Sequence, residues 1–144
     1  METGPHIRLL LWKANKAVEK VERNSIDGTG LLLSEFTVME VLLHKGPLPI
    51  NTIGKKVLLT SGSMTAAVNR LENKGLVTRV QDPSDHRCFY VHLTNEGANV
   101  IRKAYDKHAC NLETAAEVLT AAEREDLARL LKKYGRHADT VRAG

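Results

Sequence analysis

The chain has 144 residues, of which 42% are hydrophobic and 26% are charged, and its net charge is +4. This length and balance indicate one globular domain with a buried core and exclude a chain that is disordered throughout. Its two cysteines, Cys88 and Cys110, are too few for a disulfide scaffold. No apolar run approaches the roughly 20 residues that cross a bilayer, and residues 1–5 lack the features of a signal peptide, so we expect a cytoplasmic protein with no membrane partner.

Two helices are predicted in the N-terminal third. Apolar residues recur at helical spacing from Ile7 to Val21, which predicts a helix over residues 5–24. A second helix is expected to begin with Ser34 as its N-cap and to end before Gly46–Pro47. The interior of this second helix is apolar on nearly all sides, which predicts that it is buried.

A helix-turn-helix pattern follows. Two short helices are predicted over 50–57 and 61–74, joined by a tight turn, and the second has a polar outer face. The residues expected on its inner face are Met64, Ala67, Val68 and Leu71. Residues 51–79 contain five basic residues and a single acid, which indicates a polyanionic partner.

Two strands are predicted next, over 76–81 and 88–93, on either side of a charged turn. Alternation along the second strand is expected to turn Phe89, Val91 and Leu93 toward the core. A hairpin that follows a helix-turn-helix is typical of a winged helix.

Two more helices are predicted after the hairpin, the first capped by Thr94 and the second by a capping box at 120–123. Their apolar stripes, like that of the first helix, lie too far along the chain from the hairpin to belong to its small core. We therefore expect helices within 5–24 and 95–135 to form a homodimer interface. The alternative is that these helices fold back on their own chain.

The expected fold class is therefore mostly α with a small β-hairpin wing (α+β). Residues 31–94 would form the winged helix-turn-helix part, flanked by N- and C-terminal dimerisation helices.

Two motifs resemble the MarR family of winged helix-turn-helix transcription regulators. Asp85–Thr94 resembles the wing signature, an Asp-x-Arg followed after five residues by Leu-Thr, and Arg70–Val77 resembles the end of the family's recognition helix. Element order and length agree across residues 1–144 as a single MarR-like domain. The chain departs from the family pattern at Ala66 and His86, where many members have a basic residue.

The resemblance implies a homodimeric transcription regulator, commonly a repressor, that binds double-stranded operator DNA at an inverted repeat. It further implies release from DNA by a small phenolic, lipophilic or oxidising effector. Residues 59–65 are most similar to members that respond to quinones and hydroquinones. Neither an enzyme nor a cofactor is expected. Two alternatives remain open: a metal-responsive repressor, and a winged-helix protein-interaction module that does not bind DNA.

DNA contacts are expected from the second helix of the pair and from the wing. Hydroxyls near a helix N-terminus suit phosphates, Asn69 suits bidentate pairing with adenine, and Arg70 suits phosphate or guanine. The residues expected to contact DNA are Ser61, Ser63, Thr65, Asn69, Arg70, His86 and Arg87. The other interpretation of this helix is a solvated face with Ser61 as its N-cap. We expect Arg87 to enter the minor groove while the Asp85 carboxylate holds its guanidinium.

Effector sensing has two candidate locations. Cys88 follows the Arg87 cation, which favours a thiolate and makes Cys88 a candidate redox or electrophile sensor; the other interpretation is a partly exposed thiol without a role. Trp12 and Met39 are candidates for lining an effector pocket. His108 is expected to be an interface histidine, and because the six histidines lack metal-site spacing we expect no metal site.

Overall fold

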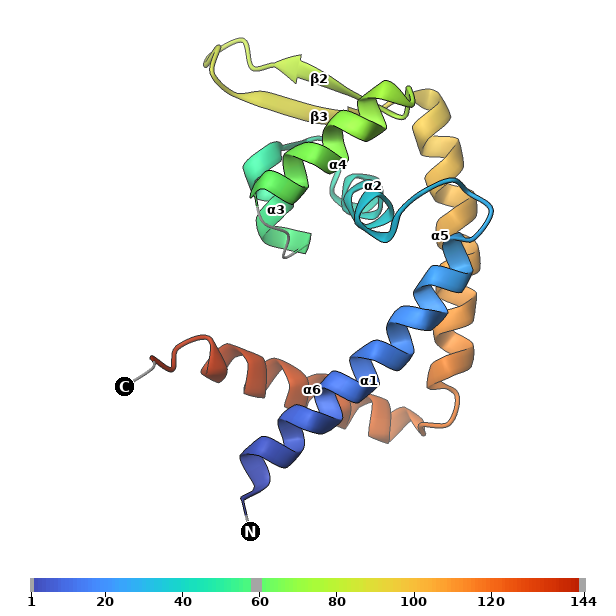
Figure 1. The fold of residues 1–144 in the computed structure, drawn as a ribbon, viewed down its shortest axis with the longest axis vertical. Coiled ribbons are helices and arrows are strands. Elements are labelled where there is room, and N and C mark those ends of the chain that lie inside the picture. The colour runs from blue at the N-terminus through green and yellow to red at the C-terminus, as the bar shows by residue number, and fades with distance from the viewer. Residues whose placement is uncertain (1, 58–60, 143–144) are drawn as a thin grey trace.

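The computed structural model describes residues 2–57 and 61–142, without the side chains of Val57 and Ser61. In chain order the described elements are α1 (Thr3–Ile26), α2 (Leu33–Lys45), β1 (Leu48–Pro49), α3 (Ile50–Val57), α4 (Ser61–Asn73), β2 (Val77–Gln81), β3 (Phe89–Leu93), α5 (Asn95–Ala116) and α6 (Ala121–Ala138). Figure 1 shows a winged part, α2 to β3, at one end of the molecule and α6 at the other, with α5 joining them. The predicted fold class is confirmed: mostly helical with a small β wing.

The hydrophobic core lies within the winged part and extends to the start of α5. Phe36 and Met39 of α2 and Ile101 of α5 are fully buried in it. Burial of an apolar side chain of this size contributes about 1.5–3 kcal/mol. The inward stripe predicted for α4 is confirmed, because Met64, Ala67, Val68 and Leu71 are all buried. This stripe fixes which face of α4 points outward.

The sheet has three antiparallel strands in the order β1-β3-β2, one more strand than the sequence predicts. The additional strand is the two-residue β1, in which Leu48 pairs with Val91 and Pro49 with Tyr90. A proline is tolerated on such an edge strand because its missing N–H faces away from the ladder. Two residues are too short to produce a period in the sequence.

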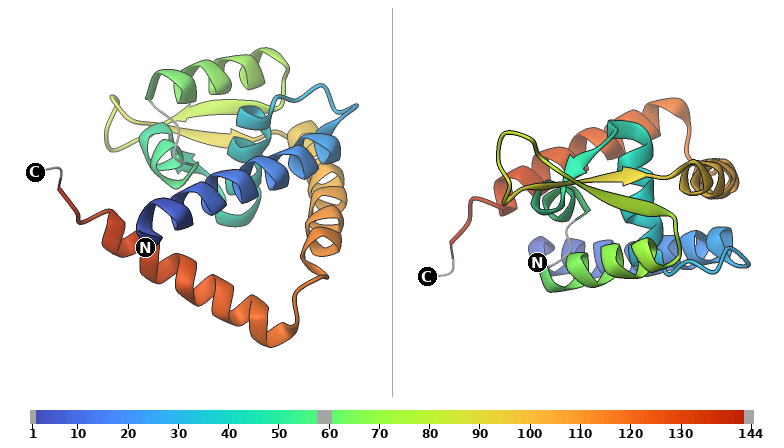
Figure 2. Two further views of the ribbon diagram at one scale, coloured as in Figure 1. Left: turned by 60° about the horizontal axis from the view of Figure 1, so that its bottom comes forward. Right: turned by 90° about the horizontal axis from the view of Figure 1, so that it is seen from above.

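The inward face of β3 is only partly as predicted. Val91 is fully buried, but Phe89 is 40% exposed. Phe89 pairs with Gln81 at the wing end of the hairpin, which projects beyond the helices in Figure 2. Alternation therefore sets the direction of the Phe89 side chain, but the described part of the chain does not cover it there.

Two of the three predicted helix N-caps are confirmed. Thr94 Oγ1 accepts from the Gly97 amide at 3.0 Å, and the Thr120 capping box is present. At α2 the prediction was wrong: the helix begins at Leu33, and the Leu32 amide donates to Glu35 Oε1 at 2.8 Å. The carboxylate of Glu35 thus satisfies a backbone amide at the helix start, where Ser34 was expected to act as the cap.

The start of α5 lies directly against the beginning of the wing. A Cβ atom on Gly97 would collide with the carbonyl oxygen of Leu76, so this close approach requires glycine. The Thr94 hydroxyl also donates to the Gly75 carbonyl oxygen at 2.7 Å. Together these contacts hold the hairpin at a fixed position on the long helix.

The two terminal helices differ in how closely they pack on the rest of the chain. The C-terminal part of α1 packs against α5, where Asn111 Nδ2 donates to Ser25 Oγ at 2.9 Å, and the N-terminal part of α1 runs away from α5 in Figures 1 and 2. None of the described residues of α6 is buried, and an ion pair of 2.7 Å joins its Arg124 to Glu113 of α5. None of the described helices combines the length and the apolar character that a bilayer-spanning helix needs.

Candidate nucleic-acid interface

The outer face of α4 is polar and open. Ser63, Thr65 and Asn69 are exposed on it, and so is Ala66, where a longer basic side chain is common in the family that the sequence resembles. Ser61 is the first residue of α4, but its side chain lies outside the described residues, as do Leu59 and Thr60 of the 59–65 stretch. The face that the sequence assigns to DNA is therefore accessible from solvent in the described part of the chain.

A buried carboxylate, which the sequence analysis missed, holds α4 against α2. Glu35 is completely buried, and its two oxygens accept from Arg70 Nε at 3.2 Å and from Lys74 Nζ at 2.9 Å. Lys74 also donates to the Gly30 carbonyl oxygen at 3.0 Å. Arg70, predicted to contact DNA, thus has its guanidinium already engaged inside the chain, while its side chain remains 41% exposed.

Glu35 stays ionised in this position. Burial raises the pKa of its carboxyl, but hydrogen bonds from the Leu32 amide, Lys74 and Arg70 outweigh that effect and hold the pKa below its ordinary value. The sequence signal that could have found Glu35 is its place three residues after Leu32, where an acid commonly closes a helix N-terminus.

A second ion pair joins α4 to the wing. Arg79 of β2 donates from Nη1 to Glu72 Oε1 at 2.8 Å and from Nη2 to Asn69 Oδ1 at 2.6 Å. Arg79 belongs to the basic residues counted in 51–79, but no individual role was expected for it. Its guanidinium fixes the edge of α4 relative to the hairpin.

The wing tip carries the arginine of the signature motif. Arg87 is 93% exposed, and its Nε lies 3.4 Å from Asp85 Oδ1, which is the pair that the sequence predicts. The Arg87 amide donates to the same Asp85 oxygen at 3.1 Å. His86, also exposed, has its carbonyl oxygen bound by Gln81 Nε2 at 2.7 Å. These hydrogen bonds order the turn while leaving the Arg87 side chain accessible.

The turn itself is closed by local hydrogen bonds. Asp82 Oδ1 accepts from the amide and the hydroxyl of Ser84, and these hydrogen bonds hold the pKa of the Asp82 carboxyl below its ordinary value. The Asp82 amide donates to the Cys88 carbonyl oxygen at 2.9 Å, which closes the base of the turn.

Comparison with known proteins identifies the family. A family model described as the MarR family matches residues 31–89. The chain is 37% identical over 126 residues to the uncharacterized HTH-type transcriptional regulator YkoM of Bacillus subtilis, covering 85% of this chain and 82% of the relative. It is 34% identical over 130 residues to the HTH-type transcriptional regulator MhqR of the same organism, covering 90% of each. The chain belongs to the MarR family. It is a DNA-binding transcription regulator with a winged helix-turn-helix, and not an enzyme.

Solved structures share this fold. A crystal structure of a mutant MarR from E. coli complexed with operator DNA has a TM-score of 0.82 at 24% identity and covers 92% of this chain and 94% of that chain. The organohalide-sensing regulator RdhR-CbdbA1625 in its 2,4-dichlorophenol bound form has a TM-score of 0.84 at 17% identity, covering 95% and 82%. At these identities the likeness concerns the fold.

The candidate sensing residues of this MarR family chain do not form one site. Cys88 is half-buried beside Arg87, and Cys110 is exposed on α5. Met39 is fully buried in the core, while Trp12 is 54% exposed on α1. These two residues therefore lie in different environments of the single chain, and their part in lining an effector pocket stays a prediction.

His108 is buried within its own chain, so the expectation of an interface histidine was wrong. Its ring lies 4.7 Å from that of Phe36 and its Nε2 is 3.8 Å from Glu40 Oε2, so the side chain joins α5 to α2. Its Nδ1 is buried and has no hydrogen-bond partner among the described residues. In the same part of the chain, no three His, Cys, Asp or Glu side chains are grouped as metal ligands.

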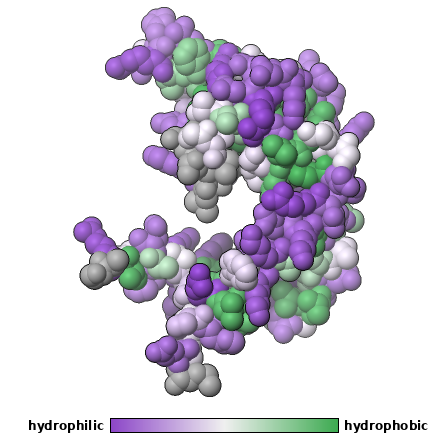
Figure 3. All heavy atoms as spheres, in the orientation of Figure 1, coloured by the Kyte–Doolittle hydropathy of each residue, from purple (hydrophilic) through white to green (hydrophobic). Residues whose placement is uncertain are grey.

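An apolar groove runs between α1 and α6. Its volume is about 610 Å³. Leu10 on one side is 51% exposed and Leu130 on the other is 49% exposed. The lining residues are Ile7, Leu10, Leu11, Ala14, Leu127, Leu130, Leu131, Lys133, Tyr134 and His137. Figure 3 shows hydrophobic side chains reaching the surface over these helices within a mainly hydrophilic face.

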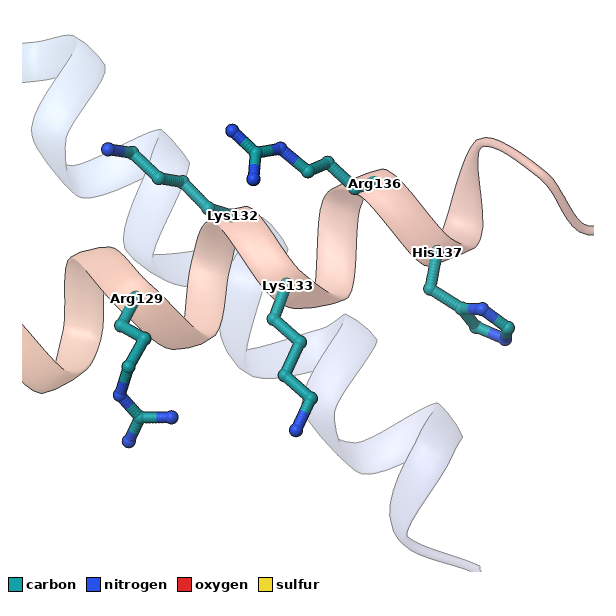
Figure 4. Close-up of a pocket in the computed structure, with 5 residues that line it drawn as sticks. All are labelled: Arg129, Lys132, Lys133, Arg136 and His137. Carbon is teal, nitrogen blue, oxygen red and sulfur yellow. The ribbon is translucent and has the colours of Figure 1, made fainter.

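The C-terminal half of α6 is also basic. Figure 4 shows Lys132 and Arg136 pointing to one side of the helix and Arg129, Lys133 and His137 to the other. Arg129 lies 3.5 Å from Asp126. Cations near a helix C-terminus are stabilised by the helix dipole. In Figure 1 this helix lies at the opposite end of the molecule from α4 and the wing.

Proposed function

We propose that this regulator is a homodimeric repressor that binds an inverted repeat in operator DNA and is released by a small phenolic, quinone-type or oxidising effector. The observation that carries the proposal is the open polar face of α4 beside the exposed Arg87 of the wing. The helix α4 has a shape that fits the major groove of DNA, and an arginine such as Arg87 suits the adjoining minor groove. The mutant MarR of E. coli, which has the same fold, is complexed with operator DNA in its crystal structure.

The proposed DNA contacts are those expected from the sequence, with one division of labour. Ser61, Ser63 and Thr65 would contact phosphates near the start of α4, and Arg87 with His86 would contact the backbone or the minor groove. Arg70 would act mainly through Glu35, which its guanidinium already contacts at 3.2 Å. In this proposal the Arg70–Glu35 ion pair fixes the recognition helix α4 on α2, while the exposed side chains of α4 contact DNA.

The groove between α1 and α6 supports the homodimer. Four large side chains of α6 that recur at helical spacing, Leu127, Leu130, Leu131 and Tyr134, are each more than 40% exposed. A continuous apolar stripe left open on a single chain is typical of an interface. We propose that the same helices of a second copy cover it, so that residues 5–24 and 95–135 act as dimerisation helices and 31–94 as the winged part.

A phenolic or quinone-type effector is supported by the thiol at the wing and by a neighbour of the same fold. RdhR-CbdbA1625 was crystallised with 2,4-dichlorophenol bound. In this chain, Cys88 lies beside Arg87, where an adduct would add bulk at the DNA contact. A reversible pocket near the terminal helices is the other route, and thermal-shift screening against phenols, quinones and metal ions distinguishes the classes, because a ligand that prefers the folded state raises the melting temperature.

The proposal is tested by binding of the purified full chain to DNA at several salt concentrations. We expect protection of an inverted repeat with half-sites about one helical turn apart, and an affinity that falls steeply as salt rises. Binding that does not depend on salt, or a single chain bound to one half-site, contradicts the proposal.

A further inference from the structure

The amide of Asn69 has a fixed direction in this structure. Asn69 is exposed on α4, and Arg79 Nη2 lies 2.6 Å from its Oδ1. A guanidinium carries only hydrogen-bond donors. The atom of the Asn69 amide that faces it must therefore be the acceptor oxygen and not the nitrogen. The Arg79 fork is itself held by Glu72 at 2.8 Å. Asn69 therefore cannot exchange its oxygen and nitrogen without losing this contact.

The fixed direction changes what Asn69 can recognise. Bidentate pairing with adenine needs the amide oxygen free to accept from N6 and the amide nitrogen free to donate to N7. Here one of the two lone pairs of the oxygen already accepts from the Arg79 cation, whose charge disfavours a second N–H donor at the same atom. The nitrogen, with its two hydrogens, is the group left to reach a base. Its natural partners are the acceptors of the major groove.

We propose that Arg79 is a specificity-determining residue: by holding Asn69 Oδ1 it makes Asn69 a donor to guanine rather than a reader of adenine. Guanine presents two neighbouring acceptors, N7 and O6, whereas adenine presents one acceptor beside a donor. The inference rests on the proposed operator binding. It reverses the expectation of adenine that Asn69 alone gives from the sequence.

Arg79 acts through Asn69 and not as a phosphate contact. Both of its terminal nitrogens are engaged inside the chain, its charge is paired with Glu72, and its side chain is 23% exposed. Loss of Arg79 is therefore expected to change which base is preferred at one position of each half-site. A residue that merely stabilised the fold, or that touched phosphate, would change affinity for all sequences alike.

The test is selection of DNA sequences from a random library by four full-length proteins: wild type, Asn69→Ala, Arg79→Ala and Arg102→Ala. Asn69→Ala identifies the position that Asn69 reads, as the one where base preference is lost. We expect guanine there for wild type, preferred over adenine by roughly five- to tenfold. Arg79→Ala should reduce that ratio to about one or invert it, and all other positions should keep their bases. Arg102→Ala removes an exposed cation of α5 and should change no preference.

Two results overturn the inference while leaving operator binding intact. One is adenine at the Asn69 position of the wild-type operator; the other is a uniform loss of affinity in Arg79→Ala with every base preference unchanged. Thermal melting of each variant checks that it is folded. Glu72→Gln weakens the other contact of the Arg79 guanidinium, so it should shift the guanine-to-adenine ratio in the same direction as Arg79→Ala by a smaller amount. A wild-type protein that selects no sequence at all would instead remove the proposed function.

Discussion

The winged part and the terminal helices bury their apolar residues in opposite ways. In the winged part, the inward side chains of α2 and α4 are covered by the chain itself, and even the carboxylate of Glu35 is enclosed. In α6, the side chains at the same helical spacing remain about half-exposed, as Leu130 shows at 49%. A helix with an open apolar stripe gains little stability from its own chain, which supports the proposal that a second copy covers it. The inward apolar side chains of the winged part are thus covered within the chain, with Ile101 of α5 completing the core, whereas those of α6 remain open for the proposed second copy.

The largest effect is expected from a charged residue placed in the apolar groove between α1 and α6. We expect Leu130→Asp to abolish the dimer, because each interface would bury two carboxylates among leucines. Operator affinity should fall by at least about 100-fold as the two half-sites lose their linked binding. Sedimentation and operator titration measure both effects. Val118→Asp places the same charge at an 82% exposed residue outside the groove and should leave the dimer intact. A Leu130→Asp protein that remained dimeric would contradict the assignment.

The stability of the winged part is tested by a substitution at the buried Glu35. Glu35→Ala leaves Arg70 and Lys74 without their shared carboxylate, and because these cations are partly exposed we expect a loss of about 2–3 kcal/mol in the free energy of unfolding, toward the low end for a broken buried pair. Chemical denaturation measures it. Glu40→Ala on the same helix, at a half-exposed carboxylate, serves as the control.

The same residue sets a pH dependence. The pKa of Glu35 in the folded chain lies below its ordinary value of 4.5, so its contribution to stability is present above that value and disappears as the pH falls through the lower folded pKa. The acid-induced loss of stability should therefore be smaller in Glu35→Ala than in wild type. Equal acid sensitivity of the two proteins would show that other carboxylates dominate.

A smaller effect is expected at the wing, which projects from the closed part. Arg87→Ala should weaken operator binding by about 1–3 kcal/mol, the contribution of one groove or phosphate contact, and should leave folding and the dimer unchanged because the side chain is 93% exposed. Fluorescence titration at two salt concentrations gives the affinity and the change in salt slope. Lys103→Ala, an exposed cation on α5, is the matched control. Unchanged affinity at physiological salt removes Arg87 from the interface.

The smallest change is expected at Cys88 until an electrophile is added. Cys88→Ser should bind the operator about as tightly as wild type, because a serine replaces the half-buried thiol with little change in volume. On titration with a benzoquinone, wild type and Cys110→Ser should leave the DNA while Cys88→Ser stays bound. If Cys88→Ser is released at the same quinone concentration as wild type, the effector acts through a reversible pocket.

The local periods of the sequence determined most of the fold. α3 runs from Ile50 to Val57 as predicted, the Thr94 and Thr120 caps are present, and the inward stripe of α4 is buried, because each depends on residues within a few turns of each other. The signature around Arg87 pointed to the MarR family for the same reason: its residues are contiguous. The Asp85–Arg87 pair could be predicted because it spans three consecutive residues.

Tertiary structure decided the features that depend on residues far apart in the chain. The two-residue β1 exists only because β3 offers it a hydrogen-bonding edge, and His108 is buried because α5 crosses α2. Glu35 joins side chains 35 and 39 positions away, and Arg79 reaches back 10 positions to Asn69. No period or motif encodes such distances. The polar character of α4 could therefore be predicted from the sequence, whereas the direction of the Asn69 amide was set by folding, which alone brings the hairpin beside the recognition helix.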